Sequence, residues 1–474
     1  MAASASNDGP TERDSSRKER APLSAYQLMI KPCGPACNLN CTYCYYLPKQ
    51  RMFDGSATRM SDLTLEEITR QYISSHGSGT ITFAWQGGEP TLAGLDFFRK
   101  ALELQEKYRP PGMMIENTLQ TNGTLLDDRW CRFLHEERFL VGLSADGPPS
   151  LHDIYRVDRT GEPTSGKVVQ ASRLLRRHRV EFNTLTVVDR ENARHPLQVY
   201  RYLRNVIGSR HMQFIPCVEP KGFERVPPQG RDAKDLPTIG DDAARPGTER
   251  SVVTEWSVDP VDYGSFMTMI FDEWLQKDVG RVFVINFEVA LASWMGLPPT
   301  ACSFAEHCGD ALVAEHDGSI YSCDHYVYPE HRLGRIQEVE LSEMVSSDQQ
   351  ARFGREKARG LPAQCRECEF LFACHGECPR NRFIRNPDGG TGLNYLCPGL
   401  RRFFIHVGPW MKLMADGIRA GRTAEDIARA QAPGRERERA DRPSGNGRGG
   451  MVSGHPRSCR PPEAGVPPPD QGRR

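Results

Sequence analysis

Three cysteines near the N-terminus restrict the structures open to this chain more than anything else in its sequence. Cys37, Cys41 and Cys44 form the pattern C-x3-C-x2-C within the stretch from Pro32 to Tyr46. The spacing brings three thiolates within reach of one small inorganic centre, and no fourth cysteine lies close by. A [4Fe–4S] cluster normally takes four cysteines, so a cluster held by three has one iron open to an exogenous ligand. A structural zinc knuckle and scattered core thiols are the alternatives, although zinc prefers four tetrahedral protein ligands.

Composition excludes several classes of protein. The 474 residues include 61 lysines and arginines and 61 aspartates and glutamates, so the overall field does not favour nucleic acid or an anionic membrane. No apolar run approaches the length of a bilayer span, and the N-terminal residues lack the apolar segment of a secretion signal. We therefore expect a cytoplasmic protein, in which the fifteen cysteines stay reduced and bind metal or clusters instead of forming disulfides.

The first half of the chain alternates β-rich runs with helix-like segments, the pattern of repeated β-α units around a parallel sheet. A helix predicted to begin at Thr64 carries Glu67 three residues on, as in a capping box. Six strands are predicted, too few for an eight-stranded barrel, so the fold class is α/β with a partial (β/α)6 TIM-like barrel. The predicted strands are Tyr26–Ile30, Thr80–Trp85, Glu116–Gln120, Leu140–Ser144, Phe182–Val188 and Met212–Pro216.

Polar or glycine-rich loops follow four of these strands. The three cysteines come after the first strand, and the loops Gln86–Pro90, Gln120–Gly123 and Ser144–Pro148 come after the next three. In α/β barrels the site forms from loops at the carboxyl ends of the strands. Gly, Asn, Asp and Pro are also ordinary turn formers, but four such loops on one rim indicate a site there.

A second group of cysteines lies in the C-terminal half. Eight cysteines fall within about a hundred residues, enough for two sites with four ligands each. Zinc is the alternative for the C-x2-C pair within this group. The eight are Cys302, Cys308, Cys323, Cys365, Cys368, Cys374, Cys378 and Cys397.

The first motif, with Tyr43 before its last cysteine, resembles the signature of the radical S-adenosylmethionine (SAM) enzymes. The resemblance implies that the amino and carboxylate groups of SAM occupy the open iron. It also implies that main-chain groups at Gly88 meet the ammonium, and that Ser144 and Arg156 donate hydrogen bonds to the carboxylate. Val218 lies where that superfamily packs adenine. The implied SAM contacts are therefore Tyr43, Gly88, Ser144, Arg156 and Val218.

The order of the eight later cysteines, together with Gly318-x4-Cys323, resembles the SPASM extension of radical SAM enzymes, which carries two auxiliary [4Fe–4S] clusters. The resemblance, and not the spacing, assigns the ligands. One cluster is assigned to Cys302, Cys308, Cys323 and Cys378, and the other to Cys365, Cys368, Cys374 and Cys397.

From about Tyr26 to Gly408 the chain resembles the anaerobic sulfatase-maturating enzymes. The motifs that carry this resemblance include WQGGEPTL, LQTNGTLL, VEFNTLTVV, CDHYVYPEHRLGRI and FACHGECPRNRF, and Ala145 departs from it where a larger aliphatic residue is common. The resemblance implies oxidation of a cysteine or serine in a Cys/Ser-x-Pro-x-Arg segment of a sulfatase to Cα-formylglycine, with release of methionine and 5′-deoxyadenosine. The implied partners are an unfolded or nascent sulfatase polypeptide and an electron donor such as ferredoxin or flavodoxin.

Asp324, directly after Cys323, is the predicted catalytic base. Oxidising a thiol or alcohol carbon requires removal of its S–H or O–H proton, and a carboxylate beside an electron-accepting cluster couples the two losses. An aspartate in a turn after a ligand loop is the alternative. The position matches the proton acceptor proposed for the family, and His325 is the nearest other candidate.

These features predict seven segments and leave two rival functions open. The rivals are a radical SAM peptide modifier that forms a thioether or carbon–carbon crosslink, and a non-catalytic zinc- or cluster-binding scaffold. The predicted segments are a disordered tail (1–22), the radical SAM partial barrel (23–225), a disordered insertion (226–250), a linking helical region (251–294), the SPASM domain (295–400), C-terminal helices (401–431) and a disordered tail (432–474).

Overall fold

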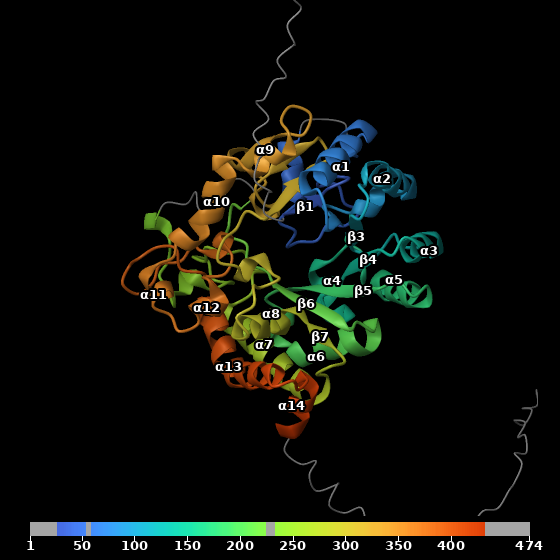
Figure 1. Cartoon of the computed structure of the whole chain (residues 1–474). Coiled ribbons are helices and arrows are strands. Elements are labelled where there is room, and N and C mark those ends of the chain that lie inside the picture. Colours follow the sequence, from blue (N-terminus) through green and yellow to red (C-terminus); the bar gives the residue numbers. More distant parts are fainter. Residues whose placement is uncertain (1–25, 54–57, 224–232, 432–474) are drawn as a thin grey trace, which may run out of the picture. The chain divides into compact units, whose positions relative to one another are not determined.

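The computed structural model describes residues 26–53, 58–223 and 233–431, and those up to Ala430 belong to one compact unit (Figure 1). The two predicted tails lie outside the described residues. In the described ranges no helix has an apolar run of the length needed to cross a membrane.

Ten strands form a single sheet in the order β10-β9-β8-β1-β2-β3-β4-β5-β6-β7. All neighbours from β8 through β1 to β7 are parallel, whereas β9 and β10 are antiparallel to their neighbours. The strands are β1 (Gln27–Ile30), β2 (Thr80–Trp85), β3 (Met114–Thr121), β4 (Leu140–Ser144), β5 (Phe182–Val188), β6 (His211–Pro216), β7 (Phe283–Val284), β8 (Ala311–Ala314), β9 (Ser319–Tyr321) and β10 (Arg332–Arg335).

The first six strands confirm the predicted partial barrel, and helices cover their outer side. Figure 1 shows α1, α2, α3 and α5 along the outside of the strands. The helices are α1 (Asp62–His76), α2 (Leu95–Tyr108), α3 (Asp128–Glu136), α4 (Pro149–Tyr155), α5 (Ser165–Arg177), α6 (Pro196–Tyr202), α7 (Pro260–Lys277), α8 (Ile285–Trp294), α9 (Leu341–Val345), α10 (Asp348–Arg359), α11 (Ala363–Arg366), α12 (Leu371–Cys374), α13 (Cys397–Arg419) and α14 (Ala424–Gln431).

Buried residues alternate with half-buried or exposed ones along most of the parallel strands, and the buried side chains form the core. Leu28, Phe83 and Leu119, on three neighbouring strands, are 0% exposed. Full burial of each such side chain contributes about 1.5–3 kcal/mol. The barrel core is therefore formed by the strands that the sequence predicts.

The N-terminus of α1 differs from the prediction. Its cap is Ser61, whose hydroxyl accepts from the backbone N–H of Thr64 at 3.1 Å. Glu67 lies further into the helix and binds Arg70 and Gln71 instead of closing a capping box. The prediction was wrong because serine in extended backbone geometry satisfies the orphan N–H groups one turn earlier.

The cysteine-rich half is continuous with the barrel sheet. β8 pairs in parallel with β1, with Leu28 opposite Leu312, and β9 and β10 extend the same edge. At the other edge β7 pairs with β6. The sequence reasoning did not predict these four strands, because each is only two to four residues long.

The insertion predicted to be disordered, 226–250, is described from residue 233 onward and is ordered there. Thr238 forms a parallel bridge with Arg385, and Ile239 donates to the Arg385 carbonyl at 2.9 Å. Leu236 and Ala244 are buried, at 8% and 6% exposure. The prediction of disorder was wrong for this part, because a segment with few apolar residues is ordered by its contacts with Arg385, far away in the sequence.

Candidate functional site

Two of the predicted SAM contacts, Tyr43 and Arg156, touch each other and Asp146. The Tyr43 hydroxyl donates to Asp146, and Arg156 donates to the Tyr43 oxygen at 2.9 Å. Arg156 also stands 3.8 Å from the Asp146 carboxylate, and all three side chains are buried. Ser144, at the end of β4, accepts from Gln120 at 3.0 Å. The Arg156 guanidinium and the Ser144 hydroxyl are therefore available as the two donors predicted for the SAM carboxylate.

Gly88 allows two backbone segments to touch. Its N–H donates to the Gly34 carbonyl at 2.7 Å, and a Cβ built at Gly88 would lie 2.0 Å from the Ala36 carbonyl oxygen. The GGEP loop thus packs against the chain just before the first cysteine. This contact is a structural reason for the glycine, additional to the predicted approach of SAM.

Glu89, in the same loop, is fully buried and joins two loops of the rim. Its carboxylate accepts from the hydroxyls of Thr91 and Thr121 and from the backbone N–H of Asn122. Burial raises the pKa of Glu89, while these hydrogen bonds oppose the rise. The sequence reasoning missed this role, because it depends on residues about thirty positions away.

Two backbone amides point at the sulfurs of the first cysteine motif. Leu39 donates to Cys37 Sγ at 3.3 Å and Leu47 donates to Cys44 Sγ at 3.4 Å. Burial raises the pKa of Cys37 and of Cys41 to about 11, and their proximity adds to the rise for Cys37. Unligated thiols here would therefore be protonated at neutral pH, whereas a cationic iron centre favours the thiolate. Three thiols, two of whose sulfurs accept hydrogen bonds from backbone amides, are a donor set that fits an iron–sulfur cluster.

The eight later cysteines form two electrostatically coupled groups. Burial is the main cause of each raised thiol pKa, and neighbouring cysteines add to the rise. In the first group, Cys378 and Cys302 raise the pKa of Cys323, Cys302 raises that of Cys308, and Cys308 raises that of Cys378. In the second group, Cys397 and Cys365 raise the pKa of Cys374, Cys365 and Cys368 raise that of Cys397, and Cys368 raises that of Cys365. This grouping supports the two interleaved sets predicted from the resemblance. Within the described ranges no three His, Cys, Asp or Glu side chains lie close enough together to hold a single metal ion, so the cysteines surround a larger space.

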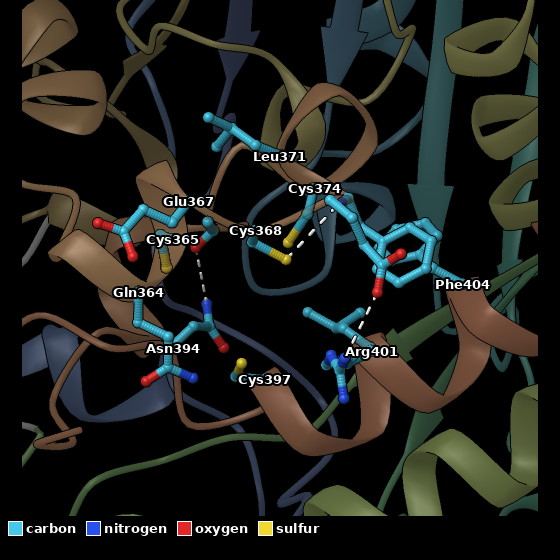
Figure 2. A pocket seen from close by; sticks show the side chains of 14 residues that line it. Gln364, Cys365, Glu367, Cys368, Leu371, Cys374, Asn394, Cys397, Arg401 and Phe404 are labelled. Carbon is cyan, nitrogen blue, oxygen red and sulfur yellow. Dashed lines mark hydrogen bonds and ion pairs between the residues drawn. The ribbon is translucent and has the colours of Figure 1, made fainter. Parts of the chain in front are cut away.

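The second group surrounds a cavity of about 440 Å³ (Figure 2). Cys365, Cys368, Cys374 and Cys397 all line it, together with Leu371 and Phe404. Figure 2 shows Cys397 facing the other three cysteines across the opening. The cavity places four thiols around one space, which is the arrangement a four-cysteine cluster requires.

Asp324 is buried and held from two sides. Lys31, which is 1% exposed, forms an ion pair with its carboxylate, and the Tyr45 hydroxyl donates to it. Burial alone would raise the pKa of Asp324, but Lys31, His325 and the two hydrogen bonds outweigh it and hold the pKa at about 2. Lys31 also lies 3.4 Å from the centre of the Tyr46 ring. Asp324 is therefore an ionised acceptor of fixed orientation.

His325 occupies a different environment. Arg380 Nη1 lies 2.9 Å from His325 Nδ1, so this nitrogen accepts and the neutral ring carries its proton on Nε2. Burial, reinforced by Arg380, lowers the pKa of His325 to about 3. A neutral ring with both nitrogens so assigned is a poor proton acceptor, which favours Asp324 between the two candidates.

Arg380 connects the second cysteine region to the barrel. Its guanidinium pairs with Glu219 and donates to the Val218 carbonyl at 3.1 Å. Val218 is 1% exposed at the end of β6, and its predicted adenine contact stays a prediction. The sequence reasoning missed Arg380 and Lys31; the only available signal was that Arg380 lies two residues after a predicted ligand.

Asp189, after β5, carries an unsatisfied oxygen. Its Oδ1 accepts from the backbone N–H groups of Glu191 and Asn192 at 2.8 and 2.9 Å. No donor among the described residues reaches its buried Oδ2. Burial raises the pKa of Asp189 to about 7 against the lowering by the Asn192 N–H, and nearby Asp146 adds to the rise.

Comparisons with known proteins agree with both halves of this arrangement. Residues 32–203 match the radical SAM superfamily, and residues 302–369 match an iron-sulfur cluster-binding domain. A serine-type anaerobic sulfatase-maturating enzyme of Bacteroides thetaiotaomicron is 43% identical over 86% of this chain and 95% of its own length. A cysteine-type anaerobic sulfatase-maturating enzyme of Clostridium perfringens is 35% identical over 84% of this chain and 100% of its own length. The solved structure of native anSMEcpe with bound AdoMet and the Cp18Cys peptide has a TM-score of 0.70 and 34% identity, and covers 83% of this chain and 99% of that chain.

Proposed function

The chain belongs to the anaerobic sulfatase-maturating enzymes, and on this premise we propose how its own residues carry the reaction. It is a radical SAM oxidoreductase with a SPASM domain, and it converts a cysteine or serine of a sulfatase to Cα-formylglycine. Its cofactors are SAM and three [4Fe–4S] clusters. When bound, these supply the one-electron cleavage of SAM, the removal of a hydrogen atom from the substrate Cβ and the acceptance of the second electron.

The proposed ligand sets use eleven cysteines. Coupling among the thiols, the amides directed at Cys37 and Cys44, and the cavity lined by Cys397 support them. The SAM-cluster set is Cys37, Cys41 and Cys44; the first auxiliary set is Cys302, Cys308, Cys323 and Cys378; the second is Cys365, Cys368, Cys374 and Cys397. Three four-iron cubes correspond to about twelve irons in protein reconstituted without air.

Asp324 is the proposed base that removes the thiol or hydroxyl proton of the substrate. The observation that carries this proposal is its ion pair with buried Lys31, which keeps the carboxylate ionised and oriented. A base must be unprotonated before reaction and within hydrogen-bond reach of the proton it takes. The Tyr45 hydroxyl donates to one carboxylate oxygen and Lys31 pairs with the other, so the substrate proton is proposed to reach a remaining lone pair of these oxygens.

Buried donors orient SAM in this proposal. Arg156 and Ser144 serve its carboxylate, Gly88 exposes main-chain groups to its ammonium, and Tyr43 fixes Arg156 against Asp146. Val218 packs against adenine from the end of β6. Charge-assisted hydrogen bonds of this kind are roughly twice as strong as neutral ones.

The enzyme acts on a sulfatase peptide, and its electron donor is proposed to be a ferredoxin or flavodoxin. We place the protein in the cytoplasm, since eleven ligand thiols must stay reduced to bind iron. An unfolded or nascent sulfatase is the proposed form of the substrate, because a residue inside a folded protein would not reach a site enclosed by a sheet and its loops.

One assay tests the function. Protein reconstituted without air is incubated with SAM, dithionite and peptides containing Cys-x-Pro-x-Arg or Ser-x-Pro-x-Arg. A formylglycine product reacts with a hydroxylamine probe, and the serine peptide becomes lighter by two hydrogens. A thioether or carbon–carbon crosslink would also lose two hydrogens but would not react with the probe, and that outcome would refute the proposed chemistry.

A further inference from the structure

A hollow on the surface lies beside the first cysteine motif and has no part in the proposed chemistry. It has a volume of about 470 Å³ and is lined by Leu39, Leu47, Gln50, Arg51 and Arg159, among others. None of the predicted SAM contacts lines it, and neither does Asp324. The hollow is therefore lined by none of the residues to which the proposed function assigns SAM binding or proton transfer.

Two residues that line this hollow hydrogen-bond directly to the ligand sulfurs. The lining residue Leu39 donates its backbone N–H to Cys37 Sγ at 3.3 Å, and the lining residue Leu47 donates to Cys44 Sγ at 3.4 Å. Arg159 Nε donates to the Cys37 carbonyl at 2.7 Å. A protein seated in the hollow would contact the backbone that holds the first cluster.

The hollow is positively charged. Arg51 and Arg159 are its charged lining residues in the described part of the chain, and both are exposed. The Arg51 side chain forms no ion pair or hydrogen bond with any described residue. Asp158, which precedes Arg159 in the chain, accepts from Thr160 and Glu162 within its own turn and lies 3.6 Å from Lys167.

A second hollow, on α2 and α3, provides a contrast. Its arginines, Arg99, Arg129 and Arg132, are interspersed with three lining glutamates, Glu103, Glu136 and Glu137. Since the whole chain has a net charge of zero, a hollow whose described lining includes two arginines and no carboxylate stands out from the average surface. Such an area attracts a partner of negative charge and speeds their encounter.

We propose that the hollow lined by Arg51 and Arg159 docks an acidic one-electron carrier protein that reduces the first cluster. This inference rests on the proposed function, which requires one electron per SAM cleaved. The carrier loses that electron, the cluster gains it, and no bond or proton changes place in the transfer. The backbone of Leu39 and Leu47, which hydrogen-bonds to Cys37 and Cys44, would lie between the two redox groups.

The test measures binding as well as reduction, with reconstituted holoenzyme and a reduced flavodoxin as the probe. Arg51→Glu should raise the dissociation constant for flavodoxin at low salt at least tenfold and make that constant depend less on salt. Gln50→Lys adds a positive charge to the hollow without removing a described side-chain contact, and it should lower the dissociation constant. Gln50→Glu should raise the dissociation constant. Arg132→Glu, in the contrasting hollow, is the matched control and should bind like wild type.

Reduction supplies the second readout. Flavodoxin-driven formation of 5′-deoxyadenosine should fall with Arg51→Glu and with Gln50→Glu, while dithionite-driven formation stays within about twofold of wild type. Formylglycine yield with dithionite tests the proposed function separately. The docking proposal is overturned if both variants bind flavodoxin like wild type, or if Arg132→Glu weakens binding as much as they do.

Discussion

Replacing Asp324 by asparagine removes the proposed base and keeps its shape. The amide oxygen can still accept from Tyr45, but it carries no charge and cannot take a proton at neutral pH. Loss of a positioned general base reduces the rate by about 10²–10⁴-fold, equivalent to roughly 3–5 kcal/mol in the barrier. Formylglycine yield should fall by at least a hundredfold, while iron content and SAM cleavage remain.

The same substitution has a second effect, on stability. Lys31 is 1% exposed and would lose its anion. Breaking a buried ion pair by removing one partner costs about 3–5 kcal/mol. A decline in activity could then arise from a disturbed loop instead of a missing base, so the single variant needs a partner variant.

The double variant Lys31→Met/Asp324→Asn separates these two effects. It removes the buried cation along with the carboxylate, so most of the lost stability should return. Formylglycine should not return, because no group has replaced the base. The assay measures formylglycine per 5′-deoxyadenosine, with urea unfolding and iron analysis in parallel.

Two results would refute this reasoning. One is a near-normal formylglycine yield from D324N, and the other is recovery of the yield in the double variant. Tyr45→Phe is the matched control, because it removes one neutral-donor hydrogen bond and leaves the carboxylate. Its yield should fall by less than that of D324N, because the base remains and the lost hydrogen bond to a charged group is worth about 1.5–3 kcal/mol.

Three further predictions follow from buried groups. Burial raises the pKa of Asp189 from 3.8 to about 7, so the stability that this group contributes is present at low pH and is lost as pH rises through 7. In urea unfolding, the stability of Asp189→Asn relative to wild type should therefore increase by roughly 2–3 kcal/mol between pH 5 and pH 8. A difference that stayed constant with pH would contradict this. Burial lowers the pKa of Lys49, 3.0 Å from the centre of the Tyr328 ring, to about 7, so wild type should lose stability as pH falls from 10 to 7, and Lys49→Met should abolish that slope. Gly88→Ala should reduce SAM cleavage at least tenfold and displace the first cysteine loop, because the new Cβ would stand 2.0 Å from the Ala36 carbonyl oxygen; unchanged iron content and SAM cleavage would show that this backbone contact can relax.

Local patterns predicted the barrel well, since the strands Thr80–Trp85, Leu140–Ser144 and Phe182–Val188 have the same bounds in the structure. These runs are rich in apolar, β-branched and aromatic residues, and every second residue or more is buried, which makes the strand signal strong. Cysteine spacing was equally informative, because thiols so close in sequence must be close in space.

The contacts around Asp324 could not be predicted in this way. Lys31 and Tyr45 reach it across nearly three hundred residues, and Arg380 reaches Glu219 across more than a hundred and fifty. No periodicity in one segment reports a partner in another. The ordered part of the insertion was missed for the same reason, since Leu236 is buried only through its distant neighbours.

The pairing of β8 with β1 has a practical consequence for building chimaeric enzymes. A SPASM region exchanged at residue 295 would carry away one edge of the sheet, including the strand hydrogen-bonded to Gln27–Ile30. The donor and the recipient would have to match in strand register, with Leu28 opposite Leu312, and in the Lys31 contact one residue beyond. Experiments that exchange domains in this family should therefore transfer β1 together with β8, β9 and β10, although almost three hundred residues of sequence separate β1 from β8.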